Sequence, residues 1–252
     1  MNSQYKLDVS KYQKGDAIIA ICFWFVLMVL YAAAGKVGNL LGVHLITVVS
    51  IILPITCIAI VLIKRQGFSS LGFRKENLWP SLCIGLLFGI LAIISKILPA
   101  IIYGWELQPF GYLLYQLLFI LVGVALVEEI IFRGYIQTRL YGIFKNDVSA
   151  ILMGALFFAL MHAPFQLASG NRAFDLSFVI WLTVTFVMHI IFNHIFRKFY
   201  SIYGPILFHT LNNWSYSLFG RDNWYIYIYL GIVVLALVIW NGRSLYLLRQ
   251  KN

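Results

Sequence analysis

Two adjacent glutamates in an apolar part of the chain are the residues best suited to chemistry. Residues 127–134 read Val-Glu-Glu-Ile-Ile-Phe-Arg-Gly and are predicted to lie at the end of a helix. Glu129 and Arg133 are four residues apart and share a helix face, so they can form an ion pair. Glu128 points about 100° away and lacks this partner, which leaves it able to act as a general base. The alternative is that both glutamates are interfacial charges at a helix end.

Two histidines also lie in apolar segments, each with a candidate partner one helical turn away. His162 follows Phe158 by four residues, and Asn213 follows His209 by four. Residues at this spacing share a face, and an imidazole and an amide on one stripe can hydrogen-bond an oxyanion. The alternative is that these groups hydrogen-bond neighbouring helices inside a bundle. The other three histidines are predicted to be packing or interface residues: His44, His189 and His194.

The composition indicates which elements position these residues. Of 252 residues, 62% are hydrophobic and only 11% are charged, whereas a soluble domain has about 25% charged residues. These values exclude a soluble monomer and a disordered chain. Long apolar stretches indicate helices, because barrel strands alternate over about ten residues. The predicted fold class is therefore all-α, a polytopic membrane helix bundle.

Eight uncharged segments are long enough to cross a bilayer core of about 30 Å. They lie within 17–35, 37–63, 77–95, 107–127, 148–171, 176–196, 199–220 and 223–242. Without a repeat or long linker, residues 1–252 are predicted to form a single membrane domain. Gly85 and Gly89 form a GxxxG motif in the third segment, which allows close helix contact. Pro164 is expected to disturb the fifth helix just after His162.

The basic residues predict the orientation of the chain. The net charge is +10, but the Lys and Arg residues are scattered beside apolar segments, so no nucleic-acid partner is expected. Fifteen of the 19 fall on the side of the N-terminus and three on the other side, with Lys96 inside or at the end of the third segment. The fifteen include Arg133 and Arg139, assigned to the loop after the fourth segment. By the positive-inside rule, both termini are predicted to be cytoplasmic.

The depths of the candidate residues can be compared along the predicted helices. Glu128 and His162 are equally distant from Lys145 in the turn between the fourth and fifth segments, each about 25 Å along its helix. In an antiparallel hairpin they would face each other. His209 lies about half as far from its own turn. The depths agree if the hairpin projects into the cytosol, which the polar run 133–139 permits.

Three motifs on consecutive segments resemble the CPBP family of membrane-embedded proteases, which includes the CaaX-processing endopeptidases and the bacterial Abi proteins. They are Glu-Glu-x-x-x-Arg at 128–133, Phe-x-x-x-His at 158–162 and His-x-x-x-Asn at 209–213. The resemblance covers roughly residues 65–220, which are predicted to form the catalytic core. The segment 68–74 also resembles the usual start of the family's conserved region.

The resemblance implies a role for each matched position. Glu128 would be the general base that activates a water molecule. His162 would hold that water and assist proton transfer. His209 and Asn213 would stabilise the tetrahedral oxyanion. Glu129, together with Arg133, would fix the helix and tune Glu128.

The resemblance leaves the metal question open. Glu128, His162 and His209 could form a zinc triad. Zinc-binding helices usually carry two histidines four residues apart together with a glutamate, whereas these groups are dispersed, so a site without a cofactor is favoured. Because hydrolysis needs water, the bundle is expected to enclose a polar cavity that opens to the cytoplasmic side.

The predicted function is that of an endopeptidase in the lipid bilayer of the bacterial plasma membrane. Its substrate would be a membrane-associated peptide or a lipid-anchored protein. One alternative is a bacteriocin self-immunity or regulatory membrane protein of the same family. Another is a transporter or proton relay that uses Glu128, Glu129 and the histidines, although no inverted repeat is visible.

Overall fold

A computed structural model describes residues 2–41, 45–220 and 231. Within these residues every regular element is helical and none is a strand. Six helices are long and apolar enough to cross a membrane. They are α2 (Lys14–Leu41), α3 (Leu45–Ile63), α4 (Leu78–Tyr103), the run Phe110–Leu140, α8 (Asp147–Ala168) and α9 (Leu176–Phe199). The all-helical, multi-pass fold class is confirmed.

Two of the eight predicted spans differ from these six. The seventh contains α10 (Tyr203–Ser217), which has 15 residues. At 1.5 Å per residue it is about 22 Å long, less than the hydrocarbon core of about 30 Å. The eighth, 223–242, lies outside the described residues, as does His44. The number of spans and the cytoplasmic position of the termini stay predictions.

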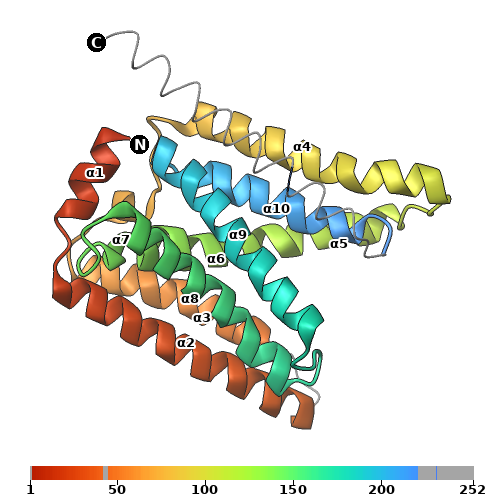
Figure 1. Cartoon of the computed structure of the whole chain (residues 1–252), viewed down its shortest axis with the longest axis horizontal. Coiled ribbons are helices and arrows are strands. Elements are labelled where there is room, and N and C mark those ends of the chain that lie inside the picture. Colours follow the sequence, from red (N-terminus) through yellow and green to blue (C-terminus); the bar gives the residue numbers. More distant parts are fainter. Residues whose placement is uncertain (1, 42–44, 221–230, 232–252) are drawn as a thin grey trace.

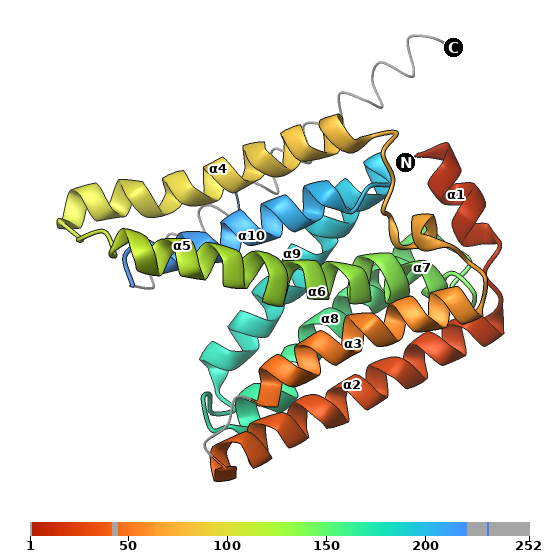
Figure 2. The ribbon, with the colours of Figure 1, turned by 180° about the vertical axis from the view of Figure 1, so that it is seen from behind.

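The helices form two groups that diverge from each other away from the N-terminus (Figures 1 and 2). One group contains α2, α3 and α8, and the other contains α4, α10 and α5 (Phe110–Phe119). Helix α9 crosses from the first group to the second. The run Phe110–Leu140 passes through the middle of the molecule, so residues at its centre are surrounded by both groups.

Glycines allow α4 and α10 to pack with their backbones close together. A Cβ atom at Gly85 would collide with the backbone of Gly204, and one at Gly89 would collide with the side chain of Leu211. The close helix contact predicted from the GxxxG motif is therefore confirmed. It fixes the position of α10, which carries His209.

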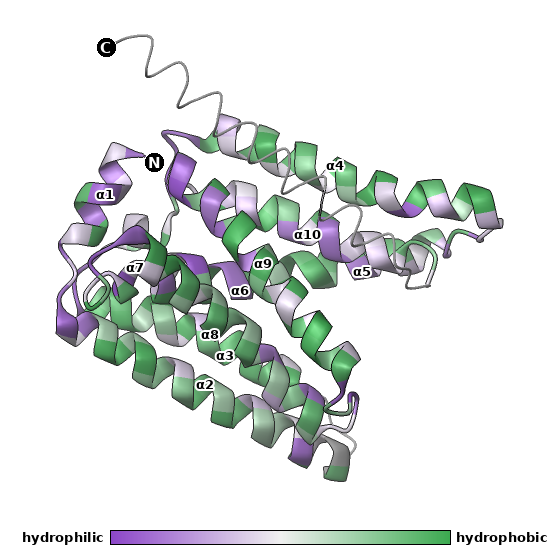
Figure 3. Cartoon of the chain, in the orientation of Figure 1, coloured by the Kyte–Doolittle hydropathy of each residue, from purple (hydrophilic) through white to green (hydrophobic). Residues whose placement is uncertain are grey.

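Apolar residues make up most of the long helices (Figure 3), and many of them are exposed. Ile55 of α3 is 58% exposed, and Ile101 of α4 is 73% exposed. In water such a surface would be unfavourable, whereas lipid chains solvate it. The exposed surface thus supports the membrane assignment made from composition.

The central run continues beyond the point where the fourth span was expected to end. It passes from α5 through a π-helical segment η2 (Ile120–Ala125), the short α6 (Leu126–Glu128), a second π-helical segment η3 (Glu129–Ile136) and α7 (Gln137–Leu140). Ending the span at Val127 was therefore wrong, and Glu128 lies near the middle of the helix. The polar residues after it are not in a loop but buried inside the protein: Arg133, Gln137, Thr138 and Arg139.

Helix α8 also continues where an interruption was expected. It includes Pro164 and extends four residues further, to Ala168. Proline is tolerated in membrane helices where neighbouring groups compensate for the lost backbone hydrogen bond. The predicted disturbance after His162 was wrong, and His162 lies on regular helix.

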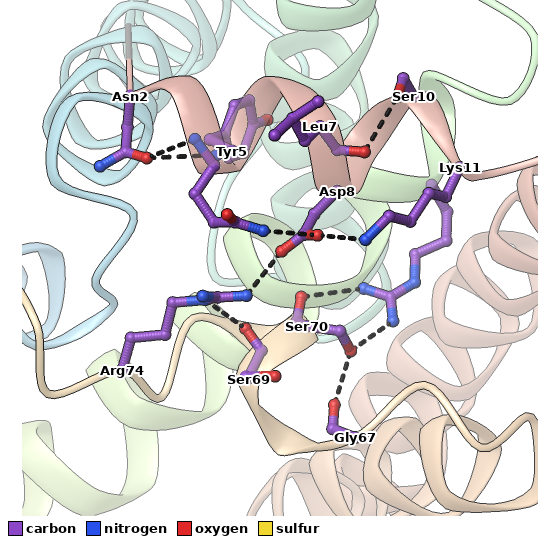
Figure 4. A network of polar contacts seen from close by, with 12 residues as sticks. Asn2, Tyr5, Leu7, Asp8, Ser10, Lys11, Gly67, Ser69, Ser70 and Arg74 are labelled. Atoms are coloured by element: carbon purple, nitrogen blue, oxygen red, sulfur yellow. Dashed lines mark hydrogen bonds and ion pairs between the residues drawn. The ribbon is translucent and has the colours of Figure 1, made fainter.

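The N-terminal helix α1 (Ser3–Ser10) caps the end of the bundle where α2 begins (Figure 1), and Figure 4 shows its polar contacts. Asn2 starts it, since its Oδ1 accepts hydrogen bonds from the amides of Gln4 and Tyr5. The fully buried ring of Tyr5 meets three other rings edge-on: Tyr141, Phe196 and Tyr200. Asp8 forms a 2.6 Å ion pair with Arg74, just after the 3₁₀ turn η1 (Phe68–Leu71). Helix α1 thereby ties together α9 and the segments that follow α3 and α7.

Candidate active site

The carboxylate of Glu128 lies between two imidazoles from different helices. Glu128 belongs to α6, and its Oε2 is 3.9 Å from Nε2 of His162 on α8 and 3.8 Å from Nε2 of His209 on α10. These separations are too long for direct hydrogen bonds. A water molecule can bridge Glu128 and either imidazole across a separation of this length.

The ring of His162 is oriented by its own helix. Its Nδ1 is 2.8 Å from the carbonyl oxygen of Phe158. A carbonyl only accepts, so Nδ1 carries a proton and donates it. In the neutral ring, Nε2 is then an acceptor that faces Glu128. The four-residue spacing of Phe158 and His162 thus orients the imidazole through a backbone carbonyl.

The ring of His209 is oriented by the second glutamate. Its Nδ1 donates to Oε1 of Glu129 at 2.8 Å, and the same oxygen lies 3.1 Å from Nη1 of Arg133. The Glu129–Arg133 ion pair predicted from the spacing is present, with both side chains fully buried. The two adjacent glutamates therefore have different partners. Glu128 faces the Nε2 atoms of both histidines, whereas Glu129 accepts a hydrogen bond from Nδ1 on the other side of the His209 ring.

Aromatic rings enclose the buried cation. The guanidinium carbon of Arg133 is 4.2 Å from the ring centre of Phe158 and 4.9 Å from that of Phe192. Phe192 also stacks on His209, with centroids 4.9 Å apart and planes at 21°. Cation–π contacts of this kind stabilise a charge that has left water. Arg133, Phe192 and His209 therefore pack as one unit.

Asn213 lies one turn beyond His209 on α10 and is half-buried. Its Oδ1 accepts a hydrogen bond from Nδ2 of Asn212 at 3.1 Å. The structure thus brings together Glu128, Glu129, Arg133, His162 and His209 by direct contact or within 4 Å. Asn213 is associated with them through its position on the same helix.

A cavity of about 370 Å³ has Glu128 and His162 in its wall. Its lining is mostly apolar and includes Tyr31 from the second half of α2, Ile46 from the start of α3 and Phe165 from the second half of α8. These residues lie toward the end of the bundle opposite α1 (Figure 1). A polar cavity that opens to the cytoplasmic side was expected. The wall of this cavity is mostly apolar, so its character differs from the expectation, and the side on which it opens stays a prediction.

Part of the chain matches a known protein family. Residues 110–215 match the family model described as Type II CAAX prenyl endopeptidase Rce1-like. This segment is therefore similar to the Rce1-like endopeptidases. The match is consistent with the resemblance to CPBP proteases, and it covers less than half of the chain. A search of curated proteins found no match.

The Rce1-like segment contains all six candidate residues and the helices that carry them, from α5 to α10. Two wall residues of the cavity, Tyr31 and Ile46, come from helices that precede the match. The site is therefore completed by parts of the chain outside the Rce1-like segment.

The arrangement of the three proposed zinc ligands can be compared with metal sites. Within the described residues, no group of three His, Cys, Asp or Glu side chains is spaced to hold a metal ion. Glu128, His162 and His209 converge, but Oε2 of Glu128 is 3.9 Å from Nε2 of His162 and 3.8 Å from Nε2 of His209. Two ligand atoms that each lie about 2.0–2.1 Å from one zinc ion are closer to each other than this. As they stand the residues do not fit a closed zinc site.

Sequence reasoning missed two residues that contact or line the site. Phe192 packs on both Arg133 and His209, yet nothing distinguishes it from the other phenylalanines of α9. Tyr31 lines the same cavity as Glu128. A phenol within an otherwise apolar span was a usable signal for Tyr31, because buried tyrosines usually place their hydroxyl beside a polar partner.

Proposed function

We propose that this protein is a membrane-embedded endopeptidase that cleaves a membrane-associated peptide or a lipid-anchored protein. The observation that carries the proposal is the convergence of Glu128, His162 and His209 in a segment that matches an endopeptidase family. The mostly apolar cavity beside them suits a substrate with apolar side chains. An extended peptide fits the reaction, since a helical peptide hides its carbonyl groups.

The proposed reaction begins with a water molecule held between Glu128 and His162. Glu128 takes one proton from the water while the water oxygen bonds to the carbonyl carbon of the substrate. The carbonyl oxygen becomes an oxyanion, which Asn213 and the doubly protonated His209 stabilise by hydrogen bonds. The carbon–nitrogen bond then breaks, and the leaving amine takes the proton from Glu128. One water molecule is consumed for each bond cleaved.

The proposal includes a location and an orientation. We place the protein in the bacterial plasma membrane with both termini in the cytoplasm. Removing the buried Arg133 and Arg139 from the count leaves 13 basic residues on the N-terminal side against three on the other. The bias that supports this orientation therefore persists after the correction.

The deciding experiment replaces Glu128 by Gln in full-length protein and compares membrane peptides by mass spectrometry. Loss of the general base should slow cleavage by about 10²–10⁴. Glu106→Gln is the matched control, because Glu106 is exposed in the connection between α4 and α5. Equal cleavage by the Glu128→Gln form and the wild type would refute the proposed function.

The same purified protein decides the metal question. We propose that the site works without a bound metal. Elemental analysis should then find no stoichiometric zinc, and chelators should leave cleavage unchanged. One zinc per chain that is lost in a His162→Ala form would show the opposite.

A further inference from the structure

Polar residues recur at every fourth position along the central helix as it leaves the site. Glu129, Arg133, Gln137 and Tyr141 follow one another at this spacing, and all four side chains are buried. From Glu129 to Tyr141 the run covers about 18 Å. It ends beside Asp147, which accepts a hydrogen bond from the Tyr141 hydroxyl at 2.8 Å.

Helix α9 carries a second series with the same spacing. His189 and Asn193 are fully buried, and Arg197 is four residues further. Nε2 of His189 is 3.3 Å from Oε1 of Gln137, and Arg197 forms a 2.6 Å ion pair with Asp147. The two series therefore meet in the middle and again at the end near α1. Together they form a polar seam (Glu129, Arg133, Gln137, Tyr141, His189, Asn193 and Arg197).

Helix α8 covers this seam without filling it. Gly154 lies opposite the middle contact, where a Cβ atom would collide with Gln137 and lie close to His189. The carbonyl oxygen of Ala150, one turn earlier, accepts a hydrogen bond from Nε2 of Gln137 at 3.0 Å. The small residue and the carbonyl that accepts from Gln137 allow polar side chains to occupy the interface of three helices.

Many polar atoms of the seam have no hydrogen-bond partner within the described residues. They are Oε2 of Glu129, Nε and Nη2 of Arg133, Nδ1 of His189, and both side-chain polar atoms of Asn193. Buried polar atoms in native proteins are almost always paired with protein groups or with water. Internal water molecules typically make about three hydrogen bonds to such groups. These orphaned donors and acceptors point to water as their partner.

We propose that the polar seam binds internal water molecules and supplies the water consumed at Glu128 from the end of the bundle capped by α1. The inference rests on the proposed function, since hydrolysis uses one water for each bond. A substrate in the apolar cavity blocks that route to the site. The seam approaches from the opposite end, where the half-exposed Asp147 reaches solvent. Substrate and water would thus reach Glu128 by separate routes.

Hydroxyl-radical footprinting by X-ray radiolysis tests the hydration directly on the intact protein in lipid nanodiscs. Radicals form from bound water, so buried residues beside internal water are oxidised. His189 of the seam and Phe192, whose ring packs on Arg133 of the seam, should be labelled several-fold faster than Phe178, after correction for intrinsic reactivity. Phe178 is equally buried, at 1% exposure, but lies outside the seam. Labelling of His189 and Phe192 as slow as that of Phe178 would overturn the proposal.

Asn193→Leu tests the supply of water, because leucine has a similar volume and no polar atom. We expect labelling of His189 to fall several-fold and kcat to fall at least several-fold with KM unchanged. Thr210→Val is the control, since Thr210 is also buried but bonds only to its own helix, at the carbonyl of Ile206. Gln137→Met serves if Asn193→Leu does not fold.

The results separate this inference from the proposed function. A dry seam with cleavage abolished by Glu128→Gln would overturn only the water route. A hydrated seam in a protein whose cleavage survives Glu128→Gln would overturn the endopeptidase and with it the supply role. Unchanged kcat in both Asn193→Leu and Gln137→Met would also overturn the supply role.

Discussion

The guanidinium group of Arg133 is buried away from water and contacts one carboxylate and two aromatic rings. Glu129 neutralises its charge, while Phe158 and Phe192 cover its faces. Because Glu129 also holds His209, the ion pair and the imidazole depend on each other. Arg133 therefore acts as a positioning residue for the candidate site.

Removing one member of this buried pair should be far more costly than removing both. Arg133→Met leaves the Glu129 carboxylate uncompensated, so we expect a loss of about 3–5 kcal/mol in the free energy of unfolding. The double form Glu129→Gln with Arg133→Met should recover much of this loss. Thermal or denaturant unfolding in detergent measures both. A loss of stability in the double form equal to the sum of the losses in the two single forms would show that the two side chains act independently.

At the residue scale, spacing along the sequence predicted which residues pair, but not which residues of other helices surround them. The four-residue rule gave the Glu129–Arg133 pair, and equal distance from one turn gave the approach of Glu128 to His162. Sequence spacing could not predict the contact between Glu129 and His209, because these residues are 80 positions apart and their contact depends on how α10 packs. The catalytic roles of these residues stay predictions.

At the scale of elements, the central helix shows why its end was placed too early. Arg133, Gln137, Thr138 and Arg139 suggest a loop in a membrane protein, because each is costly to bury alone. In the folded chain Arg139 donates to Gln66 at 2.7 Å and to the hydroxyl of Ser70 at 3.0 Å, which offsets that cost. Such partners come from distant segments, so hydropathy alone cannot reveal them. The two π-helical segments beside α6 had no visible sequence signal.

The contact between α4 and α10 gives a prediction at this scale. Gly85→Ala places a Cβ atom against the backbone of Gly204, which cannot yield as a flexible side chain would. We expect a loss of about 1–3 kcal/mol in stability from overpacking, together with reduced cleavage because α10 carries His209. Gly111→Ala is the matched control, since a Cβ atom there meets nothing within 4 Å.

Unfolding in detergent and cleavage assays on the two alanine forms provide the comparison. Gly111→Ala should be neutral or slightly stabilising, because alanine favours helix by about 1 kcal/mol over glycine. Equal stability of the two forms would contradict the close backbone contact.

At the scale of the whole molecule, composition and charge predicted the fold class but not the internal arrangement. The 62% hydrophobic content was enough to establish a helical membrane protein. The cavity beside Glu128 was expected to be polar, yet its wall is mostly apolar. That difference arises from which side chains α2, α3 and α8 turn toward the cavity, which depends on packing between helices and not on the hydropathy of any one.

The attachment of α1 to the bundle should depend on pH. Burial raises the pKa of the Asp8 carboxyl, but hydrogen bonds from Lys11 and Tyr200 and the charges of Lys11 and Arg74 outweigh it and lower the pKa below its ordinary value. The stabilisation is therefore present above the unfolded-state pKa of about 3.9 and is lost as the pH falls through the lower folded-state value.

Hydrogen exchange of the α1 amides at several pH values measures this attachment. Exchange should increase below about pH 4 in the wild type. Asp8→Asn should exchange faster at neutral pH, by a stability loss of up to about 1 kcal/mol, and lose the acid dependence. Asp175→Asn, which removes the charge of the N-cap residue at the opposite end of α9, should leave α1 unchanged. Acid-independent exchange in the wild type would refute this role of Asp8.

The two imidazoles that face Glu128 belong to different helix groups, His162 on α8 and His209 on α10. Any change in the angle between the groups alters at least one of the two separations from the carboxylate. The distance between a spin label on α2 and one on α4 would therefore report whether the candidate site is assembled, without the need for a substrate. A lipid or detergent that spreads the groups apart should inactivate the protein without unfolding a single helix.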